Sequence, residues 1–284
     1  MHRSVVISGA NGFVGRNVGM FLSKNGFQTI SLVRKGKTVN FGKTVTSQTL
    51  SENNLVSQIH GSDALLHFIG KGMQTVNSDY DTVNVGLVKN AIALCKKANI
   101  KKIIYISGLG VDKHSTLGYF ISKYKAEQEI ILSGLDYTIF RASYIIGHDD
   151  PLSKNLQQQT KKGEIVIPGS GKYRFQPIFI GDVSKVIAKS VVEKKFSRKI
   201  IDLVGPEIVS YNVFVKKFSR GKAKMKKIDF ERAYHNALHN KGPFGVDDLS
   251  IMIGDYVGDH KRLAGLAKMK FTRYGEILES RGLL

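Results

Sequence analysis

The sequence predicts an α/β protein with a doubly wound parallel sheet, and three observations favour that fold. A glycine-rich turn follows a short apolar run at the start of the chain and precedes an amphipathic segment. Four further short apolar runs follow, at spacings that leave room for crossover helices between parallel strands. The 284 residues, 42% of them hydrophobic, are enough for one large domain with or without a smaller appendage.

The segment 4–34 reads as a strand, a turn with the pattern Gly-x-x-Gly-x-x-Gly, a helix and a second strand. Gly9 permits the sharp turn, Gly12 lets backbone N–H groups approach a pyrophosphate, and Gly15 lets the helix pack close to the strand. The phosphates would lie at the helix N-terminus, where unpaired N–H groups and the helix dipole favour negative charge. We therefore predict a dinucleotide-binding Rossmann domain over residues 1–150, and a purely structural turn is the alternative. The cofactor contacts expected in the turn are Gly9, Asn11, Gly12, Phe13, Val14 and Gly15.

The second strand, residues 30–33, ends next to two cations, Arg34 and Lys35. An NAD site usually places an Asp or Glu here to bind the ribose 2′-hydroxyl, whereas a basic residue accommodates the 2′-phosphate of NADP. No acidic residue precedes Glu52 in the chain, and the Arg34 guanidinium can bind a phosphate in a forked geometry. NADP(H) is therefore favoured over NAD(H). Alternatively, both cations are only solvated residues at a strand end.

The run 64–70 reads as a buried strand that ends in glycine, where a cofactor could lie along the backbone. Phe68, Ile69 and Gly70 are the contacts expected there, and His67 in the same apolar run is interpreted as a packed core residue. A helix over 81–98 follows, and Cys95 lies on its apolar stripe, which indicates burial. The next predicted strand spans 103–106.

Tyr119 and Lys123 are separated by four positions in a helical segment that follows the strand 103–106. Residues i and i+4 share one helical face, so the phenol and the ammonium can point into the same cleft. A nearby cation stabilises phenolate and lowers the tyrosine pKa, which lets tyrosine exchange protons near neutral pH. The pair is therefore a catalytic candidate.

The second half of the chain has a looser pattern. A strand over 137–141 leads through Ser143 and Tyr144 to Gly147, and a turn-rich loop over 165–177 contains Arg174 and Gln176. An amphipathic helix then begins near residue 182, a short strand spans 200–204 and several basic helices follow. We expect a Rossmann domain over 1–150, with a returning strand and helix near 175–204. The region 151–284 is expected to be a smaller, mostly helical substrate-binding region.

The formal net charge of +20 is compatible with a nucleic-acid or membrane-surface partner. The basic residues are spread along the chain, however, and no helix-turn-helix, zinc-finger or aromatic RNA-binding signature accompanies them. We interpret the charge as a surface that favours anionic small molecules, with nucleic acid and peripheral membrane contact as weaker alternatives. A single cysteine excludes an intramolecular disulfide and a cysteine-based zinc cluster, and no metal site is expected. No long apolar span is present and strand-like sequence begins at Val5, so a cytoplasmic protein is predicted.

Further motifs follow the glycine turn in order. They are Tyr80-x-x-x-Asn84, Ile106-Ser107-Gly108, Tyr119-x-x-Ser122-Lys123, Arg141-Ala142-Ser143 with Gly147, Arg174-Phe-Gln176-Pro177-Ile and Asp182-Val183. In this order they resemble the atypical extended short-chain dehydrogenase/reductases, the NAD(P)-dependent epimerase/dehydratase-like proteins. Within that superfamily the chain is most similar to the group that contains the nucleotide-binding accessory subunit of respiratory complex I.

The resemblance implies roles for individual residues. Tyr119 is the acid/base, Lys123 holds the tyrosine and the nicotinamide ribose, and Asn84 belongs to the cofactor site. Two positions depart from the family pattern: Gln48 stands where an Asp near the adenine is frequent, and Ala142 replaces a usual proline.

A serine or threonine of the family polarises the substrate carbonyl or alcohol. The position that usually carries this hydroxyl is Leu109 in this chain. Ser107, at the end of the same strand, is the candidate that remains, with Ser115 or Thr116 as alternatives.

The resemblance further implies that the C-terminal half forms a small lid over the carboxyl edge of the sheet, where open α/β folds bind ligands. The substrate-binding candidates are Ser143, Tyr144, Arg174 and Gln176, although the last two would equally suit ties between lid and sheet. The predicted function is an NADP(H)-dependent oxidoreductase or epimerase that acts on the carbonyl or hydroxyl of a small anionic substrate. A non-catalytic NADPH-binding structural subunit or redox sensor is the alternative.

Overall fold

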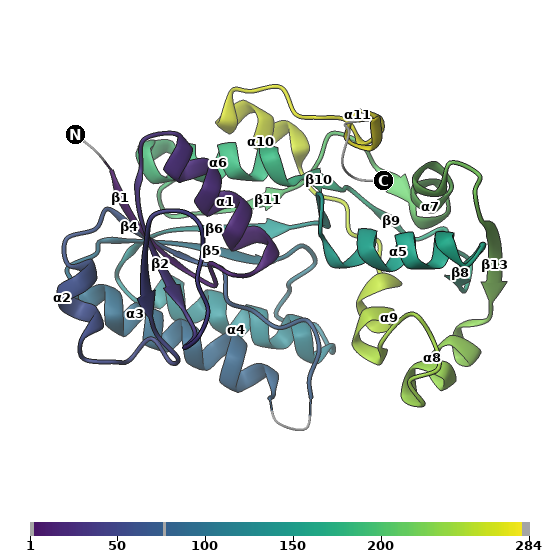
Figure 1. Ribbon diagram of the computed structural model, residues 1–284, viewed down its shortest axis with the longest axis horizontal. Helices are drawn as coiled ribbons and strands as arrows, with labels where there is room; N and C mark the ends of the chain where they lie inside the picture. The colour runs from purple at the N-terminus through teal and green to yellow at the C-terminus, as the bar shows by residue number, and fades with distance from the viewer. Residues whose placement is uncertain (1–2, 76–77, 280–284) are drawn as a thin grey trace.

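A seven-stranded parallel sheet forms the central layer of the computed structural model, which describes residues 3–75 and 78–279 (Figure 1). Its strands are β1 (Ser4–Ser8), β2 (Gln28–Val33), β3 (Lys43–Thr46), β4 (Ala64–His67), β5 (Lys102–Gly108), β6 (Asp136–Ala142) and β11 (Lys199–Leu203). They run parallel in the order β11-β6-β5-β4-β1-β2-β3. The strand order therefore reverses between β1 and β4, and ligands of open α/β sheets bind outside the carboxyl ends of strands at such a point. The predicted doubly wound fold is confirmed.

Helices cover both faces of the sheet (Figure 1). One face carries α1 (Phe13–Lys24), α6 (Ile180–Val192) and α10 (His260–Ala267), and the other carries α2 (Leu55–Ile59), α3 (Leu87–Lys97) and α4 (Gly118–Leu132). Alternate side chains of β1 serve the two faces, because Val5 and Ile7 belong to one buried cluster and Val6 to the other. A strand buried on both sides is apolar at successive positions, which explains the continuous apolar runs of the sequence. Cys95 is buried in the second cluster, as predicted.

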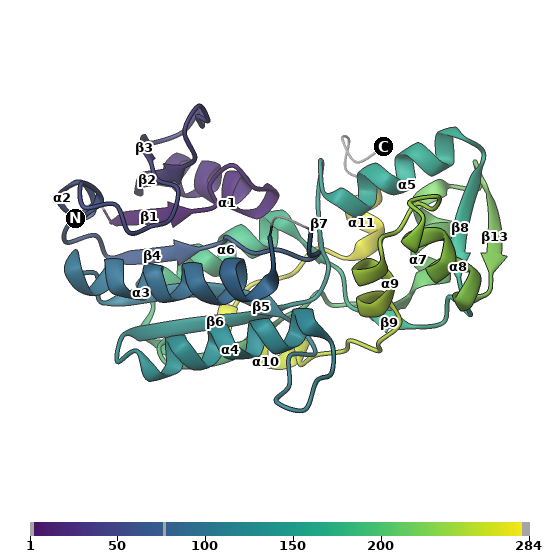
Figure 2. The same cartoon turned by 90° about the horizontal axis from the view of Figure 1, so that it is seen from below.

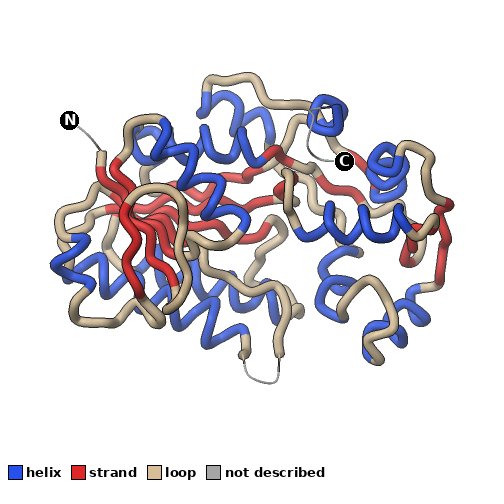
Figure 3. The backbone as a smooth tube through the Cα atoms, viewed as in Figure 1, coloured by secondary structure: helices blue, strands red, loops and turns tan. Residues whose placement is uncertain are grey.

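A third buried cluster lies beyond one end of the sheet (Figure 2). It is formed by α5 (Pro151–Lys161), α7 (Tyr211–Ser219), α8 (Phe230–Leu238), α9 (Val246–Met252), α11 (Tyr274–Glu279) and the parallel pair β8 (Glu164–Pro168) and β13 (Lys224–Ile228). Aromatic rings pack within it, and the rings of Phe214 and Tyr274 stack with centroids 4.7 Å apart. This region is mostly helical, whereas the strands of the sheet gather in the other half of the molecule (Figure 3).

Two short strand pairs join the sheet to this helical region. They are β7 (Ile145–Ile146) paired with β10 (Ile178–Phe179), and β9 (Arg174–Phe175) paired with β12 (Val209–Ser210). Two short turns lie within the sheet layer's connections: a π-helical turn η1 (Asp81–Gly86) precedes α3, and a 3₁₀ turn η2 (Lys194–Phe196) precedes β11. The chain leaves the sheet after β6 and returns through α6 and β11. It returns once more through α10, because Leu263 and Ala267 pack in the first cluster, and this last return was not expected from the sequence.

The edge strand β3 was also not expected, since residues 36–62 have no apolar run. Val45 is the single buried position of this four-residue strand. An edge strand with one buried side chain leaves no hydrophobic pattern in the sequence.

Within the described residues, no helix combines the length and the apolar character that crossing a membrane requires. The helix α4, for example, has 15 residues and carries charged side chains such as Lys125 and Glu129.

Candidate functional site

The glycine turn between β1 and α1 leaves no room for side chains at two positions. Gly9 has a φ of +77°, and a Cβ there would lie 2.8 Å from the carbonyl carbon of Phe68, just after β4. A Cβ at Gly15 would overlap the carbonyl oxygen of Gly9. Glycine is required at both positions, because a side chain would push α1 and the ends of β1 and β4 apart.

The first turn of α1 presents backbone N–H groups beside this turn. Gly12 precedes the helix, no side chain caps the helix, and the first turn, which includes residues 13–15, contains no acid. Such N–H groups bind phosphate. Asn11 donates from Nδ2 to the carbonyl oxygen of Thr38 at 2.9 Å, which ties the loop after β2 to the turn. The cradle therefore fits the pyrophosphate of a dinucleotide.

Arg34 and Lys35 follow β2 directly, and both side chains are exposed. Glu52, the first acid of the sequence, is engaged in its own turn: its carboxylate accepts hydrogen bonds from the N–H groups of Gln48 at 2.7 Å and Thr49 at 2.9 Å. Partial burial acts against these bonds, but they hold the pKa of Glu52 down at about 2. A carboxylate bound in this way is not available to a ribose hydroxyl.

The backbone that follows β4 comes close to Lys123. Phe68 and Ile69 are half-buried, and Gly70 is exposed. A Cβ at Gly70 would lie 3.0 Å from Lys123 Nζ. The absence of a side chain at Gly70 therefore lets the ammonium approach the backbone along which a cofactor is expected to lie.

Asn84 fixes this loop to α4. It is fully buried in η1, its Oδ1 accepts a hydrogen bond from the N–H of Lys71 at 2.8 Å, and its Nδ2 donates to Ser122 Oγ at 2.9 Å. Single π-helical turns are frequent at functional sites because they redirect a side chain within a helix. Asn84 thus holds the loop after β4, rather than lying on an open surface.

Lys123 is buried at the junction of β5 and α4. Its ammonium donates to the Tyr105 hydroxyl at 3.1 Å and to the Ile106 carbonyl oxygen at 3.2 Å. Burial lowers the pKa of Lys123 to about 8, and Glu127, one helical turn away, opposes this shift. The Glu127 carboxylate is itself held by Arg141 in a fork, with distances of 3.0 and 2.7 Å.

Tyr119 lies in the first turn of α4, with its ring against Phe120 and Tyr80 at centroid distances of 5.2 and 6.1 Å. Burial raises the pKa of Tyr119 to about 12, and Tyr256 adds to the rise. The sequence-based expectation of a lowered pKa for Tyr119 was therefore wrong. Burial disfavours the phenolate, and the Lys123 ammonium, 6.0 Å from the centre of the Tyr119 ring, donates to other groups. The phenol is neutral at physiological pH and can act as a proton donor.

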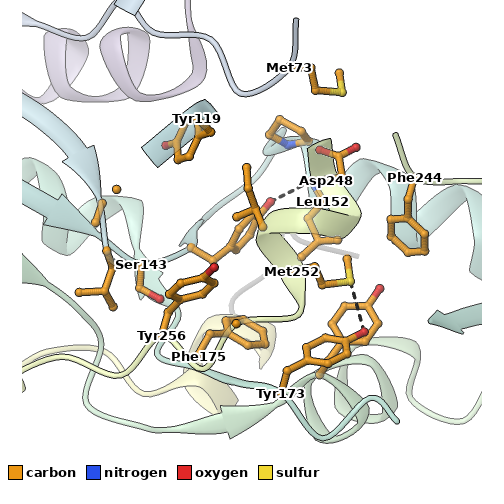
Figure 4. A pocket seen from close by; sticks show the side chains of 18 of the residues that line it. Met73, Tyr119, Ser143, Leu152, Tyr173, Phe175, Phe244, Asp248, Met252 and Tyr256 are labelled. Carbon is orange, nitrogen blue, oxygen red and sulfur yellow. Dashed lines mark hydrogen bonds between the residues drawn. The ribbon is translucent and has the colours of Figure 1, made fainter. Parts of the chain in front are cut away.

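A cavity of about 450 Å³ opens beside Tyr119 (Figure 4). Its lining is mainly aromatic and aliphatic, and includes Phe120, Leu152, Tyr173, Phe175, Phe244 and Met252. The predicted substrate residues Ser143 and Tyr144 also line it, but Arg174 and Gln176 do not.

The hydroxyl candidates of the sequence lie elsewhere. Leu109 lines the cavity, at the position where a hydroxyl is usual in the family, whereas Ser107, Ser115 and Thr116 do not line it. Ser107 is buried, and its Oγ has no hydrogen-bond partner within the described chain.

Arg174 and Gln176 hold a segment of the helical region against the sheet. The Arg174 guanidinium binds Asp255 through Nε at 2.9 Å and Nη2 at 2.8 Å. The Gln176 side chain accepts a hydrogen bond from the N–H of Gly258 at 2.6 Å and donates to the Gly205 carbonyl oxygen at 3.2 Å. These contacts correspond to the alternative interpretation, in which the two side chains tie lid and sheet together.

The segment held in this way contains Tyr256, which is not among the site residues predicted from the sequence. Its backbone N–H donates to the Arg174 carbonyl oxygen at 2.9 Å. Its ring lies 5.5 Å from that of Phe120 and close to Gly110, where a Cβ would lie 2.5 Å from it. Tyr256 lines the same cavity as Tyr119 (Figure 4). No local motif marks this tyrosine, because it reaches the site only through long-range contacts.

Comparison with known proteins agrees with this geometry. A family model described as NAD(P)H-binding matches residues 9–174. The chain is 24% identical over 215 residues to the mitochondrial NADH dehydrogenase (ubiquinone) 1 alpha subcomplex subunit 9 of Arabidopsis thaliana, which covers 71% of this chain and 54% of that protein. It is 26% identical over 226 residues to the chloroplastic divinyl chlorophyllide a 8-vinyl-reductase of the same plant, which covers 72% and 53%. The chain spans about half the length of these relatives.

Solved structures share the fold over nearly the whole chain. A nucleoside-diphosphate-sugar epimerase from Staphylococcus aureus has a TM-score of 0.77 at 15% identity, with 99% of this chain and 100% of that chain covered. The UDP-glucuronic acid 4-epimerase from Bacillus cereus, in complex with UDP-glucuronic acid and NAD, has a TM-score of 0.76 at 15% identity, with 98% and 97% covered. These structures confirm the fold that the resemblance implied. Because the matching family model covers more than half of the chain, the protein belongs to the NAD(P)H-binding family.

Proposed function

We propose that this protein is an NADP(H)-dependent oxidoreductase that reduces the carbonyl group of a small substrate. The observation that carries the proposal is the position of Tyr119, whose neutral phenol lines the cavity on the helix that also supplies Lys123. The ammonium of Lys123 in turn lies beside the backbone after β4, which adjoins the glycine turn. A dinucleotide cradle, a buried cation and a proton donor thus succeed one another along one edge of the sheet.

When bound, the nicotinamide supplies a hydride. The first turn of α1 would hold the pyrophosphate, and Lys123 would hold the nicotinamide ribose. Tyr119 donates its phenolic proton to the carbonyl oxygen of the substrate, which becomes an alcohol. The ammonium of Lys123 stabilises the phenolate that remains until the tyrosine regains a proton from solvent.

Tyr256 supplies the second hydroxyl that the reaction needs. Leu109 makes the usual position apolar, and Tyr256 is a hydroxyl-bearing residue that lines the cavity near Tyr119. A hydrogen bond from Tyr256 to the same carbonyl oxygen would polarise it and favour the developing alkoxide.

The preference for NADP(H) rests on Arg34 and Lys35. Their exposed side chains follow β2, where the ribose of the adenosine half is expected, and Glu52 is held in its own turn. A 2′-phosphate would gain charge-assisted hydrogen bonds there, whereas the 2′-hydroxyl of NAD would find no carboxylate.

A non-catalytic NADPH-binding subunit is the second candidate. Leu109 favours it, since an enzyme of this fold with an apolar residue at the hydroxyl position has lost one usual catalytic group. The relative that is a subunit of NADH dehydrogenase supports this candidate, and the relative that is a reductase supports turnover.

The two candidates are separated by Tyr119→Phe. NADPH oxidation is followed by nicotinamide absorbance with a panel of uncharged and anionic carbonyl compounds, and NADPH affinity is measured by fluorescence titration. The oxidoreductase loses turnover in Tyr119→Phe but keeps NADPH affinity, because only the proton donor is removed. Equal turnover in the variant overturns the role of Tyr119. Tight NADPH binding without turnover of any compound supports the second candidate, a non-catalytic NADPH-binding subunit.

A further inference from the structure

The cavity beside Tyr119 differs in charge from the protein as a whole. The chain has a net charge of +20, but none of the described residues that line the cavity is Lys, Arg or His. Asp248 lines it and carries the one carboxylate of that set, which accepts a hydrogen bond from the Gly245 N–H at 3.0 Å. A phosphate or carboxylate that entered would lose its hydration, find no cation and approach an acid. The sequence-based expectation of an anionic substrate therefore has no support in this cavity.

The polar side chains of the lining are largely bonded to other protein groups. These bonds are Tyr144 with Asp150, Ser143 with the Gln176 N–H, Asn155 with the Pro243 carbonyl and Tyr173 with the Met252 sulfur. The hydroxyls of Tyr119 and Tyr256 differ from these groups, because neither has a hydrogen-bond partner within the described chain. Neither hydroxyl is among the fully buried polar atoms that lack a partner. The hydroxyl of Tyr211, which also belongs to the lining, has no partner within the described residues but is fully buried. The cavity thus offers the hydroxyls of Tyr119 and Tyr256 to a substrate, and most of the remaining lining is apolar.

The apolar surface is suited to flat rings. Phe120, Phe175 and Phe244 contribute aromatic side chains, and aromatic pairs stack favourably beyond the area that they bury. Met73 and Met252 add flexible thioethers that adapt to irregular shapes. A volume of about 450 Å³ lies in the range of sites that enclose small molecules.

We propose that the substrate is an uncharged ketone, or the corresponding secondary alcohol, with a largely apolar ring body. Its oxygen binds the hydroxyls of Tyr119 and Tyr256, and its rings fill the part of the cavity lined by Phe175, Phe244 and Met252. This inference rests on the proposed function for the role of the oxygen. The site excludes nucleotide sugars, because a diphosphate would lie against an apolar wall without a cation.

The test compares three probes on the full chain saturated with NADP⁺, which cannot reduce them. They are 4-acetylbiphenyl, its analogue 4′-acetylbiphenyl-4-carboxylate and UDP-glucose, and affinities are measured by titration calorimetry. We expect the neutral ketone to bind at least about tenfold more tightly than either anion, since burying an unpaired charge is costly. Tighter binding of the carboxylate or of UDP-glucose would overturn the inference, and so would failure of all three to bind.

A charge placed in the cavity provides the second measurement. Met252→Lys adds a cation at the last residue of α9, where the helix dipole tolerates it, and Met252→Leu is the matched control. Both are made together with Asp248→Asn, because Asp248 is one helical turn before position 252 and would otherwise pair with the lysine. Both variants lose the contact with the Tyr173 hydroxyl, but only the lysine pairs with a carboxylate. We expect Met252→Lys to shift the preference towards the carboxylate and Met252→Leu to leave it unchanged. An unchanged preference in both variants, with cofactor affinity retained, contradicts the proposed location of the ring body.

The inference and the proposed function fail in different ways. If the neutral ketone binds but no NADPH is oxidised, the result supports the proposed ligand class and contradicts the proposed oxidoreductase activity. Oxidation of NADPH with an anionic carbonyl compound, but not with neutral ones, leaves the oxidoreductase standing and removes the substrate class.

Discussion

The cofactor cradle and the substrate cavity meet at one edge of the sheet, but they are built in different ways. The cradle uses backbone groups of one continuous segment, 9–15, in which two glycines lie against other backbone atoms. The cavity uses side chains drawn from residues 73 to 256, on both the sheet and the helical region. Close backbone packing tolerates no added atom, whereas a cavity wall of side chains can change and keep the fold. Substitutions in the cradle should therefore affect folding and cofactor binding, and substitutions in the cavity should affect rate and specificity.

The largest effect is expected from Gly15→Ala. The added methyl overlaps the Gly9 carbonyl oxygen, so α1 must move away from β1. We expect a loss of about 2 to 4 kcal/mol in the free energy of unfolding and loss of NADPH binding. Gly265→Ala is the control, since this exposed position in α10 has no neighbouring atom within 4 Å, and a gain of about 0.5 to 1 kcal/mol is expected there. Chemical denaturation and NADPH titration measure both, and unchanged NADPH affinity in Gly15→Ala would show that the close approach is not needed.

Tyr256→Phe tests the cavity side of the comparison. Removal of the hydroxyl takes away one hydrogen bond to the substrate oxygen, so kcat should fall about 100-fold while the affinity for NADPH stays the same. The matched control is Tyr173→Phe, which removes a cavity hydroxyl that is already bonded to Met252 and should leave kcat nearly unchanged. Steady-state kinetics with the best ketone provide the measurement. An unchanged kcat in Tyr256→Phe would show that this tyrosine only lines the cavity and does not take part in the reaction.

Arg34→Ala tests how the cofactor site distinguishes NADPH from NADH. The variant loses the forked pairing with a 2′-phosphate, so its affinity for NADPH should fall about tenfold or more while its affinity for NADH is unchanged. Lys24→Ala, at the far end of α1, controls for the loss of one positive charge. Fluorescence titration with both cofactors is the measurement. An equal loss of affinity for NADPH and for NADH would show that Arg34 does not bind the 2′-phosphate.

The smallest effect concerns pH and Lys123. Its pKa is lowered by burial to about 8 from an ordinary value of 10.5, so the unfolded chain binds more protons than the folded protein between these values. Stability should therefore rise with pH in this window, by about 1.5 kcal/mol between about pH 8 and about pH 9.5. In Lys123→Met this increment should be absent. Urea unfolding of both proteins at the two pH values tests it, and parallel curves would contradict a buried, depressed lysine.

Much of the fold could be predicted because its signals are local. The apolar runs that became β1, β4, β5 and β6 are buried on both faces, and that burial demands apolar residues in succession. The glycine turn could be read for the same reason, since a positive φ at Gly9 and close packing at Gly15 restrict single residues. By contrast, β3 could not be predicted as a strand of the sheet, and α10 could not be predicted as a helix that covers it. An exposed edge strand and a short helix carry too few buried residues to leave a pattern.

The cofactor half of the predicted site could be proposed from the sequence, because its signals are local: Gly9, Gly12 and Gly15 lie in one turn, and Tyr119 and Lys123 lie on one helical face. The substrate half depends on contacts between segments that are far apart in the chain. The sequence allows Arg174 and Gln176 to serve as ligands or as ties, and in the fold their side chains contact Asp255 and Gly258. The same contacts bring Tyr256 to the cavity, and none of the described residues of its wall is a cation, in a protein whose charge is +20. Net charge is a sum over the whole surface, whereas binding depends on the few groups that a fold places around one cavity.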